Sequence, residues 1–557
     1  MLLTRQTVLN YLTQHNRAWL LTLIGVVCLV YLPFLGNAFF LDDLTYIALG
    51  SAREYVHGFF SFDLRWLSYA TLDWTALQFT DVVPDMFHLG NALLHIANVI
   101  LLFFLLRRLM AAVISEHDQA VAARGAWFGA LIFACHPVAV YAVGYVVQRS
   151  IVMATLFALA TQLFYLRALS SGHKRWLGLA IASYFLAIFS DEHSVMLPAL
   201  LAAMTFLLRD KTKLSRRVLW LGLAAFFVMG ILLILRAQGV FGSPYATIAA
   251  LMPEQSGVGE KSFSVQLMLM LTQMVLYFKY LLLWLLPNPA WMSVDMRIHA
   301  IDSWTAWQAW AGALGFVAFG AMAFGLLLRG QKKGLAGLAL LYPWLMFLVE
   351  FVSSRSQDPF VLYRSYLWLP GLLLLIPLFL QKFPGRRTLL ALGLAILLLV
   401  PLAWNRLWVF ADSYRLWNDA ALQLSADPAK GRNQGDMPEA GAQRILFNRA
   451  MALVVAQKWP EAAAELKYVV ALYPNLPPAH HALGMAYLNV DRFEEAIVQF
   501  DAGIQLDSAY AGNYYGKGLA LLRMRKLEQV APLMRKACEL GNEIPACLLS
   551  GLTNGKK

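Results

Sequence analysis

The chain has 557 residues, of which 59% are apolar and only 14% carry a charge, far fewer than the roughly 25% of soluble domains. This composition excludes an ordinary soluble protein and predicts an all-α, polytopic membrane protein. The formal net charge of +12 does not indicate a nucleic-acid partner, because most Lys and Arg residues fall in short loops between apolar runs, where they set membrane orientation.

Eleven apolar runs are long enough to cross about 30 Å of hydrocarbon. Arg5 and Arg17 precede the first run and no small-residue cleavage site follows it, so we expect a retained first helix. The predicted spans lie near residues 19–35, 84–106, 125–147, 151–169, 176–190, 194–208, 218–235, 304–328, 334–353, 366–381 and 388–404.

Five of the joints between these runs are rich in basic residues, and they alternate with joints that contain few. Because basic joints stay in the cytoplasm, we expect the N-terminus there, in the inner membrane of a bacterium. Everything after about residue 404 is then expected on the opposite, periplasmic side, and so are Asp42, Asp43, Arg149, Asp191, Glu192 and Arg364. The basic joints contain Arg107, Arg108 and Arg124, then Lys174 and Arg175, then Arg209, Lys211, Lys213, Arg216 and Arg217, then Arg329, Lys332 and Lys333, then Lys382, Arg386 and Arg387.

One further apolar run, at 263–286, carries Lys279 and lies between two polar loops that contain proline. If this run crossed the membrane, every later basic joint would change sides. We therefore expect a re-entrant or interfacial hairpin on the periplasmic side, where irregular backbone can line a cavity.

After residue 404 the sequence changes to mixed charge with helical periodicity. The predicted domains are a membrane domain at 1–404, a linker at 405–440 and a periplasmic module at 441–557. The module repeats every 34 residues, the period of tetratricopeptide repeats, so we expect three units stacked into a short solenoid with a concave face. The repeated positions are Ala450, Gly484 and Gly518; Leu453, Tyr487 and Leu521; Ala462, Ala496 and Val530; and Leu466, Phe500 and Met534.

Four cysteines are present, and no Cys or His spacing typical of a metal site occurs in the sequence. Cys538 and Cys547 lie near the end of the module. In an exported compartment they could form a disulfide, and the alternative is two buried thiols.

Asp42 and Asp43 follow directly after the first apolar run. Two adjacent acids at the mouth of a membrane bundle are costly to dehydrate, so we expect them in a water-accessible cleft and interpret them as catalytic. The alternative is that they solvate a loop and cap a short helix.

The second span places His88, Asn91 and His95 on one helical face, where they form a polar seam or contact a ligand. The third contains His136 before Pro137, a dipeptide that predicts a kink.

Three charged residues lie at the periplasmic ends of later spans. Arg149 is a candidate phosphate contact. Glu192, between Asp191 and His193, is a candidate site residue at the turn between the fifth and sixth spans. The alternative is that this turn is only a solvated loop. Arg364 lies beside aromatic residues and is placed either to face a lipid phosphate or to snorkel at the interface.

A series of short motifs then follows one order along the chain: Arg65-Trp66-Leu67-Ser68, Phe87-His88-Leu89-Gly90-Asn91 with His95, His136-Pro137, Val147-Gln148-Arg149, Ser190-Asp191-Glu192-His193 with Pro198, Tyr366-Leu367-Trp368-Leu369-Pro370, and the repeats. In this order the chain resembles the transmembrane-and-tetratricopeptide O-mannosyltransferase-like proteins and their bacterial relatives, which are GT-C glycosyltransferases. The resemblance spans nearly the whole chain, although each motif is loose.

The resemblance implies a GT-C-like fold, a lipid-phosphate-linked sugar as donor, and an acidic residue of the first external loop as catalytic base. Asp42 and Asp43 match that acidic pair. Donor binding is assigned by resemblance to Arg65, His88, His136, Arg149, Glu192 and Arg364.

The chain departs from the family pattern at four positions. Trp66 replaces the usual Pro, Tyr141 a Glu, and Asp191 a Lys, and Arg364 lies one place further from the Tyr-Leu motif than the family's basic residue.

The predicted function is therefore inverting transfer of a sugar from a polyprenyl phosphate to a hydroxyl of an exported protein, for example a pilin, which the repeats recruit. Asp42 is favoured as the base. No cofactor is required, although paired carboxylates could also hold a divalent ion. The alternatives are a ligase or polymerase that uses a lipid pyrophosphate, a non-catalytic scaffold built on the repeats, and a transporter that relays protons through Glu350.

Overall fold

The computed structural model describes residues 5–44, 47, 63–78, 83–115, 118–237, 263–296, 301, 303–353, 360–425 and 442–541. Within these ranges the chain forms helices and connecting turns, with no strand, as the predicted all-α fold class requires. Two compact units divide the chain, Met1–Asp412 and Ser413–Lys557.

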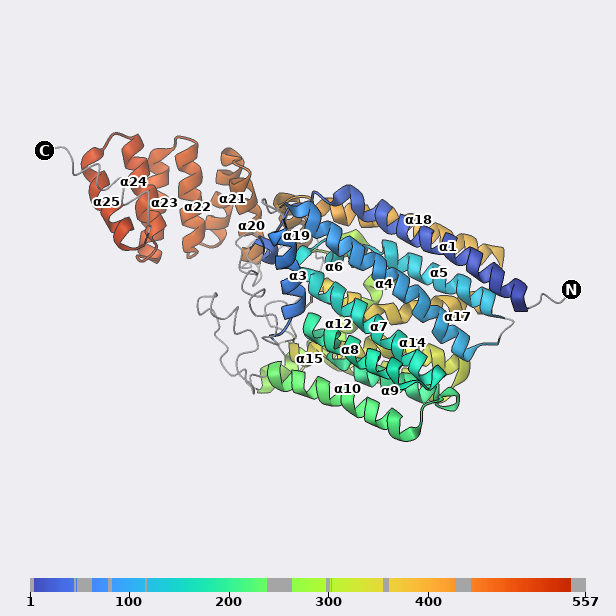
Figure 1. Cartoon of the computed structure of the whole chain (residues 1–557). Coiled ribbons are helices and arrows are strands. Elements are labelled where there is room, and N and C mark those ends of the chain that lie inside the picture. Colours follow the sequence, from blue (N-terminus) through green and yellow to red (C-terminus); the bar gives the residue numbers. More distant parts are fainter. Residues whose placement is uncertain are drawn as a thin grey trace. The chain divides into compact units, whose positions relative to one another are not determined.

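The first unit is a bundle of helices (Figure 1), and most of its long helices are apolar. Its helices are α1 (Arg5–Tyr31), α3 (Trp66–Leu77), α4 (Pro84–Val113), α5 (Gln119–Cys135), α6 (Val140–Val143), α7 (Arg149–Ser171), α8 (Lys174–Ser190), α9 (Leu197–Leu207), α10 (Arg216–Ala237), α12 (Phe263–Leu285), α13 (Trp307–Leu328), α14 (Gln331–Phe347), α15 (Glu350–Ser353), α16 (Ser365–Trp368), α17 (Leu375–Lys382) and α18 (Arg386–Val409).

By length and composition, eight helices of the described residues could cross a membrane. A ninth is added if the helices Gln119–Cys135 and Pro137–Val143, which meet at 49°, form one span. The bend lies at the predicted proline kink. The prediction of eleven spans is too high by this measure, because α8 and α14 have only 17 residues and the helical segment Glu192–Leu207 is shorter still.

The five basic joints meet at one end of the bundle, which we name the basic end. Their side chains and backbones are tied together across the joints, although they lie far apart in sequence. The contacts are Lys211 Nζ to Ala112 O (2.5 Å), Lys213 N to Leu169 O (2.7 Å), Lys332 Nζ to Asp118 Oδ2 (3.7 Å) and Gln381 Nε2 to Asp118 Oδ2 (2.7 Å). This clustering is the arrangement that the alternating charge pattern predicts.

We name the opposite end of the bundle the site end. Both the first helix of the unit, α1, and the last, α18, end there. Trp404 Nε1 donates to Leu29 O at 3.2 Å, and Ala38 N donates to Ala411 O at 3.3 Å. Since α1 and α18 lie side by side and run in the same direction (Figure 1), the start of α1 and residue 411 lie at opposite ends of the bundle.

The run predicted as a hairpin is one uninterrupted helix, α12, of 23 residues, and the hairpin prediction is wrong. The charge that argued against a simple helix is accommodated locally, because Lys279 Nζ lies over the ring of Phe360 at 5.0 Å from its centroid. The segment Gln266–Leu285 is long and apolar enough to cross a membrane.

The second unit consists of α19 (Ser413–Ser425) followed by three helix pairs, α20 (Ala442–Val455) with α21 (Trp459–Leu472), α22 (Pro477–Asn489) with α23 (Phe493–Leu506), and α24 (Ala511–Arg523) with α25 (Leu527–Glu539). The second helix of each pair begins 34 residues after the previous one. The segment predicted as a linker, 405–440, is helical in part, because it contains the end of α18 and the whole of α19.

The 34-residue period is also visible in the turns and the core. Gln457, Asp491 and Arg525 adopt left-handed φ values of 56°, 60° and 60° at equivalent turns. The small residue Gly484 lies where an added Cβ would be 2.7 Å from Phe500 Cε1, so the two helices can approach only with glycine there. The predicted tetratricopeptide packing is confirmed. Cys28 and Cys135 are free thiols, and Cys547 lies outside the described residues.

Candidate functional site

The two adjacent aspartates point into different surroundings. Asp42 is exposed, whereas Asp43 is fully buried. Leu41 before them adopts a left-handed φ of 52°, a conformation that costs a non-glycine residue energy. The loop is held against the segment before α7, because Asp43 Oδ1 accepts from Val147 N at 2.7 Å and Asp42 N donates to the Tyr145 hydroxyl at 3.1 Å.

Burial sets the protonation of Asp43. Desolvation raises the pKa of its carboxyl well above the usual value, the Val147 N–H partly opposes this, and the neighbouring charge of Asp42 raises it further. Asp43 Oδ2 is buried without a hydrogen-bond partner in the described part of the chain. Asp43 is therefore suited to hold a proton and fix the loop, and Asp42 is the carboxylate that faces solvent.

We expect Asp43→Asn to become more stable than the wild type as the pH rises above about 4, the unfolded-state pKa of Asp. The folded wild type holds its proton to higher pH than the unfolded chain, so its stability falls through this window by up to about 1.4 kcal/mol per pH unit. Asparagine copies the protonated carboxyl and does not titrate. Thermal unfolding in detergent at several pH values measures the difference, and parallel curves for both proteins would contradict it.

Arg149, at the start of α7, is buried and hydrogen-bonded to neutral groups. It donates to Asn91 Oδ1, the Thr71 carbonyl, the Thr75 hydroxyl and the Phe87 carbonyl at 2.9–3.1 Å.

Gly90 makes room for this guanidinium, since an added Cβ would lie 2.7 Å from Arg149 Nη2. No carboxylate within the described residues forms an ion pair with Arg149, so its positive charge remains uncompensated by direct contact.

Arg65 forms a bidentate ion pair with Glu192. Its Nε and Nη2 donate to the two carboxylate oxygens at 2.8 and 2.5 Å, and its Nε also lies 3.6 Å from Asp191 Oδ2. The pair is partly accessible, with side-chain exposures of 20% and 17%. Arg65 has a left-handed φ of 63° immediately before α3, so backbone strain occurs at this site residue as it does at Leu41.

A chain of buried charged groups continues from Asp191. Asp191 Oδ1 accepts from His193 Nδ1 at 2.6 Å, and His193 Nε2 lies 3.4 Å from Glu350 Oε1. Glu350 Oε2 in turn accepts from Arg364 Nη1 at 2.7 Å. We call the six residues Arg65, Asp191, Glu192, His193, Glu350 and Arg364 the charge network. Its three cations and three carboxylates balance.

The electrostatics of the network favour the charged forms at the turn after α8. Burial acts to raise the pKa of Asp191, but Arg65 and His193 hold it below its usual value. Burial likewise opposes the lowered pKa of Glu192, which Arg65 causes. Burial lowers the pKa of His193, yet Asp191 and Glu350 outweigh it and raise the pKa to about 9. The imidazole is therefore a cation at neutral pH.

Tyr363 links the aspartate loop (residues 41–43) to the charge network. It precedes Arg364 in the chain, and its ring centroid is 6.3 Å from that of Tyr145, whose hydroxyl accepts from Asp42 N. The structure thus brings together Asp42, Asp43, Arg65, Glu192 and Arg364 at the site end.

The two predicted donor-binding histidines contact main-chain carbonyls. His88 Nε2 is 3.0 Å from Asn37 O, which ties α4 to the aspartate loop. His136 caps the turn at 137–139 by accepting from Val138 N through Nδ1, and its Nε2 lies 3.1 Å from Trp284 O. Both nitrogens of His136 are thus used within the fold. A donor contact by either ring stays a prediction.

Asp191, Glu192 and His193 are also close enough together to hold a metal ion, with one ligand atom of each within 4.8 Å of the others. However, their oxygens already accept hydrogen bonds from Arg65, His193 and Ser150. The arrangement fits an ion-pair network better than a cation site, because Arg65 supplies the positive charge that a metal would.

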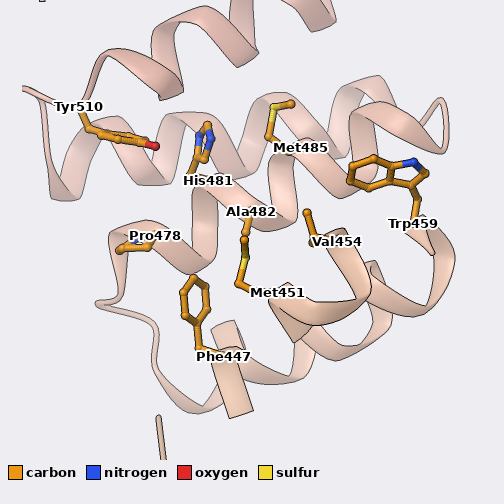
Figure 2. A pocket seen from close by; sticks show the side chains of 9 residues that line it. All are labelled: Phe447, Met451, Val454, Trp459, Pro478, His481, Ala482, Met485 and Tyr510. Atoms are coloured by element: carbon orange, nitrogen blue, oxygen red, sulfur yellow. The ribbon is translucent and has the colours of Figure 1, made fainter. Parts of the chain in front are cut away.

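The module contains a second candidate surface. A cavity of about 250 Å³ opens between the first helices of neighbouring repeats and is lined by no acidic residue, Lys or Arg (Figure 2). The lining residues are Phe447, Met451, Val454, Trp459, Pro478, His481, Ala482, Met485 and Tyr510. Methionine and aromatic side chains of this kind adapt to apolar peptide segments.

Three residues of this region have no site role in the sequence analysis. Tyr145 lies in no motif, and His193 lies in the motif Ser190-Asp191-Glu192-His193 without a role of its own. Glu350 appears there only in the transporter alternative, although a carboxylate within an apolar run is itself a signal that a buried cation must lie nearby.

No family model and no curated protein matches the chain. Several solved structures are similar to part of it, among them the following three. A double mutant of MamA RS-1 is 24% identical over 25% of this chain and 74% of its own, with a TM-score of 0.21. MamA 41-end from Desulfovibrio magneticus RS-1 is 22% identical over 26% and 84%, with a TM-score of 0.20. YrrB, a TPR protein, is 18% identical over 32% and 89%, with a TM-score of 0.21. Scores this low support no argument about function.

Proposed function

We propose that the protein is a membrane glycosyltransferase that moves a sugar, with inversion, from a polyprenyl phosphate to a hydroxyl of an exported protein. The observation that carries the proposal is the division of the aspartate loop into an exposed carboxylate, Asp42, and a buried one, Asp43. Asp42 takes the proton of the acceptor hydroxyl as that oxygen attacks the anomeric carbon. Asp43 positions the loop through Val147.

The leaving phosphate requires positive charge nearby. Arg65 is the most accessible arginine of the charge network, and its pairing with Glu192 is partly exposed. A lipid phosphate that reaches this pair can replace the Glu192 carboxylate on Arg65. The guanidinium group binds a carboxylate and a phosphate in the same way, by donating two parallel hydrogen bonds to two oxygens. Arg149 adds uncompensated positive charge from below the surface.

Exposed tryptophans support a membrane interface at the site end. They lie at the start of α13 and the end of α18, where amphipathic rings mark the boundary between lipid and water in membrane proteins. They are Trp304, Trp307, Trp310, Trp404 and Trp408, with exposed fractions of 41%, 71%, 54%, 37% and 56%. On this proposal the basic end faces the cytoplasm, and Asp42 faces the periplasm at the level where a lipid phosphate lies.

The module is proposed to recruit the exported acceptor through the cavity of Figure 2. Its apolar lining suits a short apolar segment of that acceptor.

The test is incubation of the purified protein with a panel of radiolabelled polyprenyl-phosphate sugars and exported proteins from the same cell. We expect label on one acceptor and an anomeric configuration opposite to that of the donor. Transfer only from lipid pyrophosphate carriers would favour a glycan ligase instead. A complete lack of transfer and of lipid-phosphate binding would support the non-catalytic scaffold.

A further inference from the structure

His193 occupies the middle of the charge network. Its side chain is only 3% exposed, and each ring nitrogen faces a carboxylate, Asp191 on one side and Glu350 on the other. These acids come from different parts of the bundle, because Asp191 directly follows α8 and Glu350 begins α15. A cation between two buried carboxylates holds both against a charge repulsion that would otherwise separate them.

Each of these carboxylates also holds an arginine. Asp191 lies 3.6 Å from Arg65 Nε, and Glu350 binds Arg364 Nη1 at 2.7 Å. The charges therefore alternate along one path, from Arg65 through Asp191, His193 and Glu350 to Arg364. The separation between the two arginines depends on the imidazolium at the centre.

The charge network reaches the aspartates through Tyr363. This residue precedes Arg364 in the chain, its ring centroid is 6.3 Å from that of Tyr145, and the Tyr145 hydroxyl accepts from Asp42 N. Arg364 is buried, whereas the Arg65 side chain is 20% exposed. Arg65 is therefore the arginine of the network that an anionic oxygen from outside can reach.

We propose that His193 is a positioning residue for the donor: by bridging Asp191 and Glu350 it fixes Asp191 beside Arg65, the accessible arginine that the proposed function places at the lipid phosphate. This inference rests on the proposed glycosyl transfer. His193 itself does not contact the donor. The raised pKa of His193, caused by the two acids against the effect of burial, supports an imidazolium in this role at neutral pH.

The test compares His193→Gln with His193→Lys in the full-length protein. The glutamine can donate only one way and carries no charge, whereas the lysine keeps a cation between the acids. We expect His193→Gln to raise the KM for the sugar donor about tenfold, as loss of one charge-assisted contact does, with kcat changed less than threefold. His193→Lys should restore the KM to within about threefold of wild type.

Binding of sugar-free polyprenyl phosphate in detergent provides a readout that needs no acceptor. Its Kd should rise about tenfold in His193→Gln and be largely restored in His193→Lys. The matched control is His480→Gln, which replaces a buried histidine of the module. In the wild type, His480 Nδ1 is 2.9 Å from Gln499 Oε1 and Nε2 is 2.8 Å from Pro474 O. This variant should lower thermal stability and leave the Kd unchanged.

Each outcome is decisive. If wild type binds polyprenyl phosphate and His193→Gln binds equally well, the inference is overturned and the proposed function is not. If wild type neither binds polyprenyl phosphate nor transfers sugar, both are overturned. If His193→Gln does not fold, His193→Lys decides the matter: a Kd near that of wild type supports the inference, and a tenfold loss overturns it.

Discussion

Asp42→Asn is expected to lower kcat for sugar transfer by about 10²- to 10⁴-fold, the range lost when a general base is removed. The KM for the lipid-linked donor should change little, because the base acts on the acceptor hydroxyl in the transition state. Stability should stay within about 0.5 kcal/mol of wild type, since the Asp42 side chain is exposed. Initial rates at saturating donor and thermal unfolding measure the two effects.

The matched control for this variant is Asp210→Asn. Asp210 is 89% exposed at the basic end of the bundle, where the account places no chemistry. It should retain the wild-type rate. A rate for Asp42→Asn equal to that of Asp210→Asn would remove Asp42 from the mechanism.

Arg364→Met is expected to lower the free energy of unfolding by about 3–5 kcal/mol, the cost of leaving one partner of a buried ion pair uncompensated. The partner, Glu350, has a side chain that is only 1% exposed. Removing both charges in Arg364→Met/Glu350→Gln should recover much of this loss, because no charge is then stranded. Thermal or denaturant unfolding in detergent gives the comparison.

A partly exposed pair of the same chemistry serves as the control. Arg449 and Glu465 in the module are 2.6 Å apart with side-chain exposures of 18% and 27%. Arg449→Met should cost about 1 kcal/mol or less, after allowance for solvent screening. An equal loss in Arg364→Met and in the double variant would show that the buried charge balance is not what stabilises this end of the bundle.

The features that could be predicted from the sequence are those that depend on residue types recurring at regular spacing along the chain. The period of 34 residues identified the helix pairs of the module, because small residues such as Gly484 must recur wherever two helices approach closely. The alternation of basic joints similarly predicted which turns meet at the basic end. Both patterns depend on residue types at regular spacing and need no knowledge of distant contacts.

The features that could not be predicted depend on contacts between distant segments. Lys279 was one reason to predict a hairpin at 263–286. In the structure its ammonium group lies over the ring of Phe360, and the segment forms one unbroken helix, α12. The partners of Glu350 lie 14 residues later, at Arg364, and far earlier, at His193, and no spacing rule links them. Likewise, the sequence gives no sign that Trp284 O contacts His136.

The most direct test of the central claim is radiolabelled sugar transfer by wild type and by Asp42→Asn/Asp43→Asn, purified in parallel and matched for folded protein. We expect transfer by the wild type and none above background by the double variant. Both proteins should bind sugar-free polyprenyl phosphate with similar affinity, because the arginines of the charge network are intact. Transfer by the double variant at the wild-type rate would contradict the account.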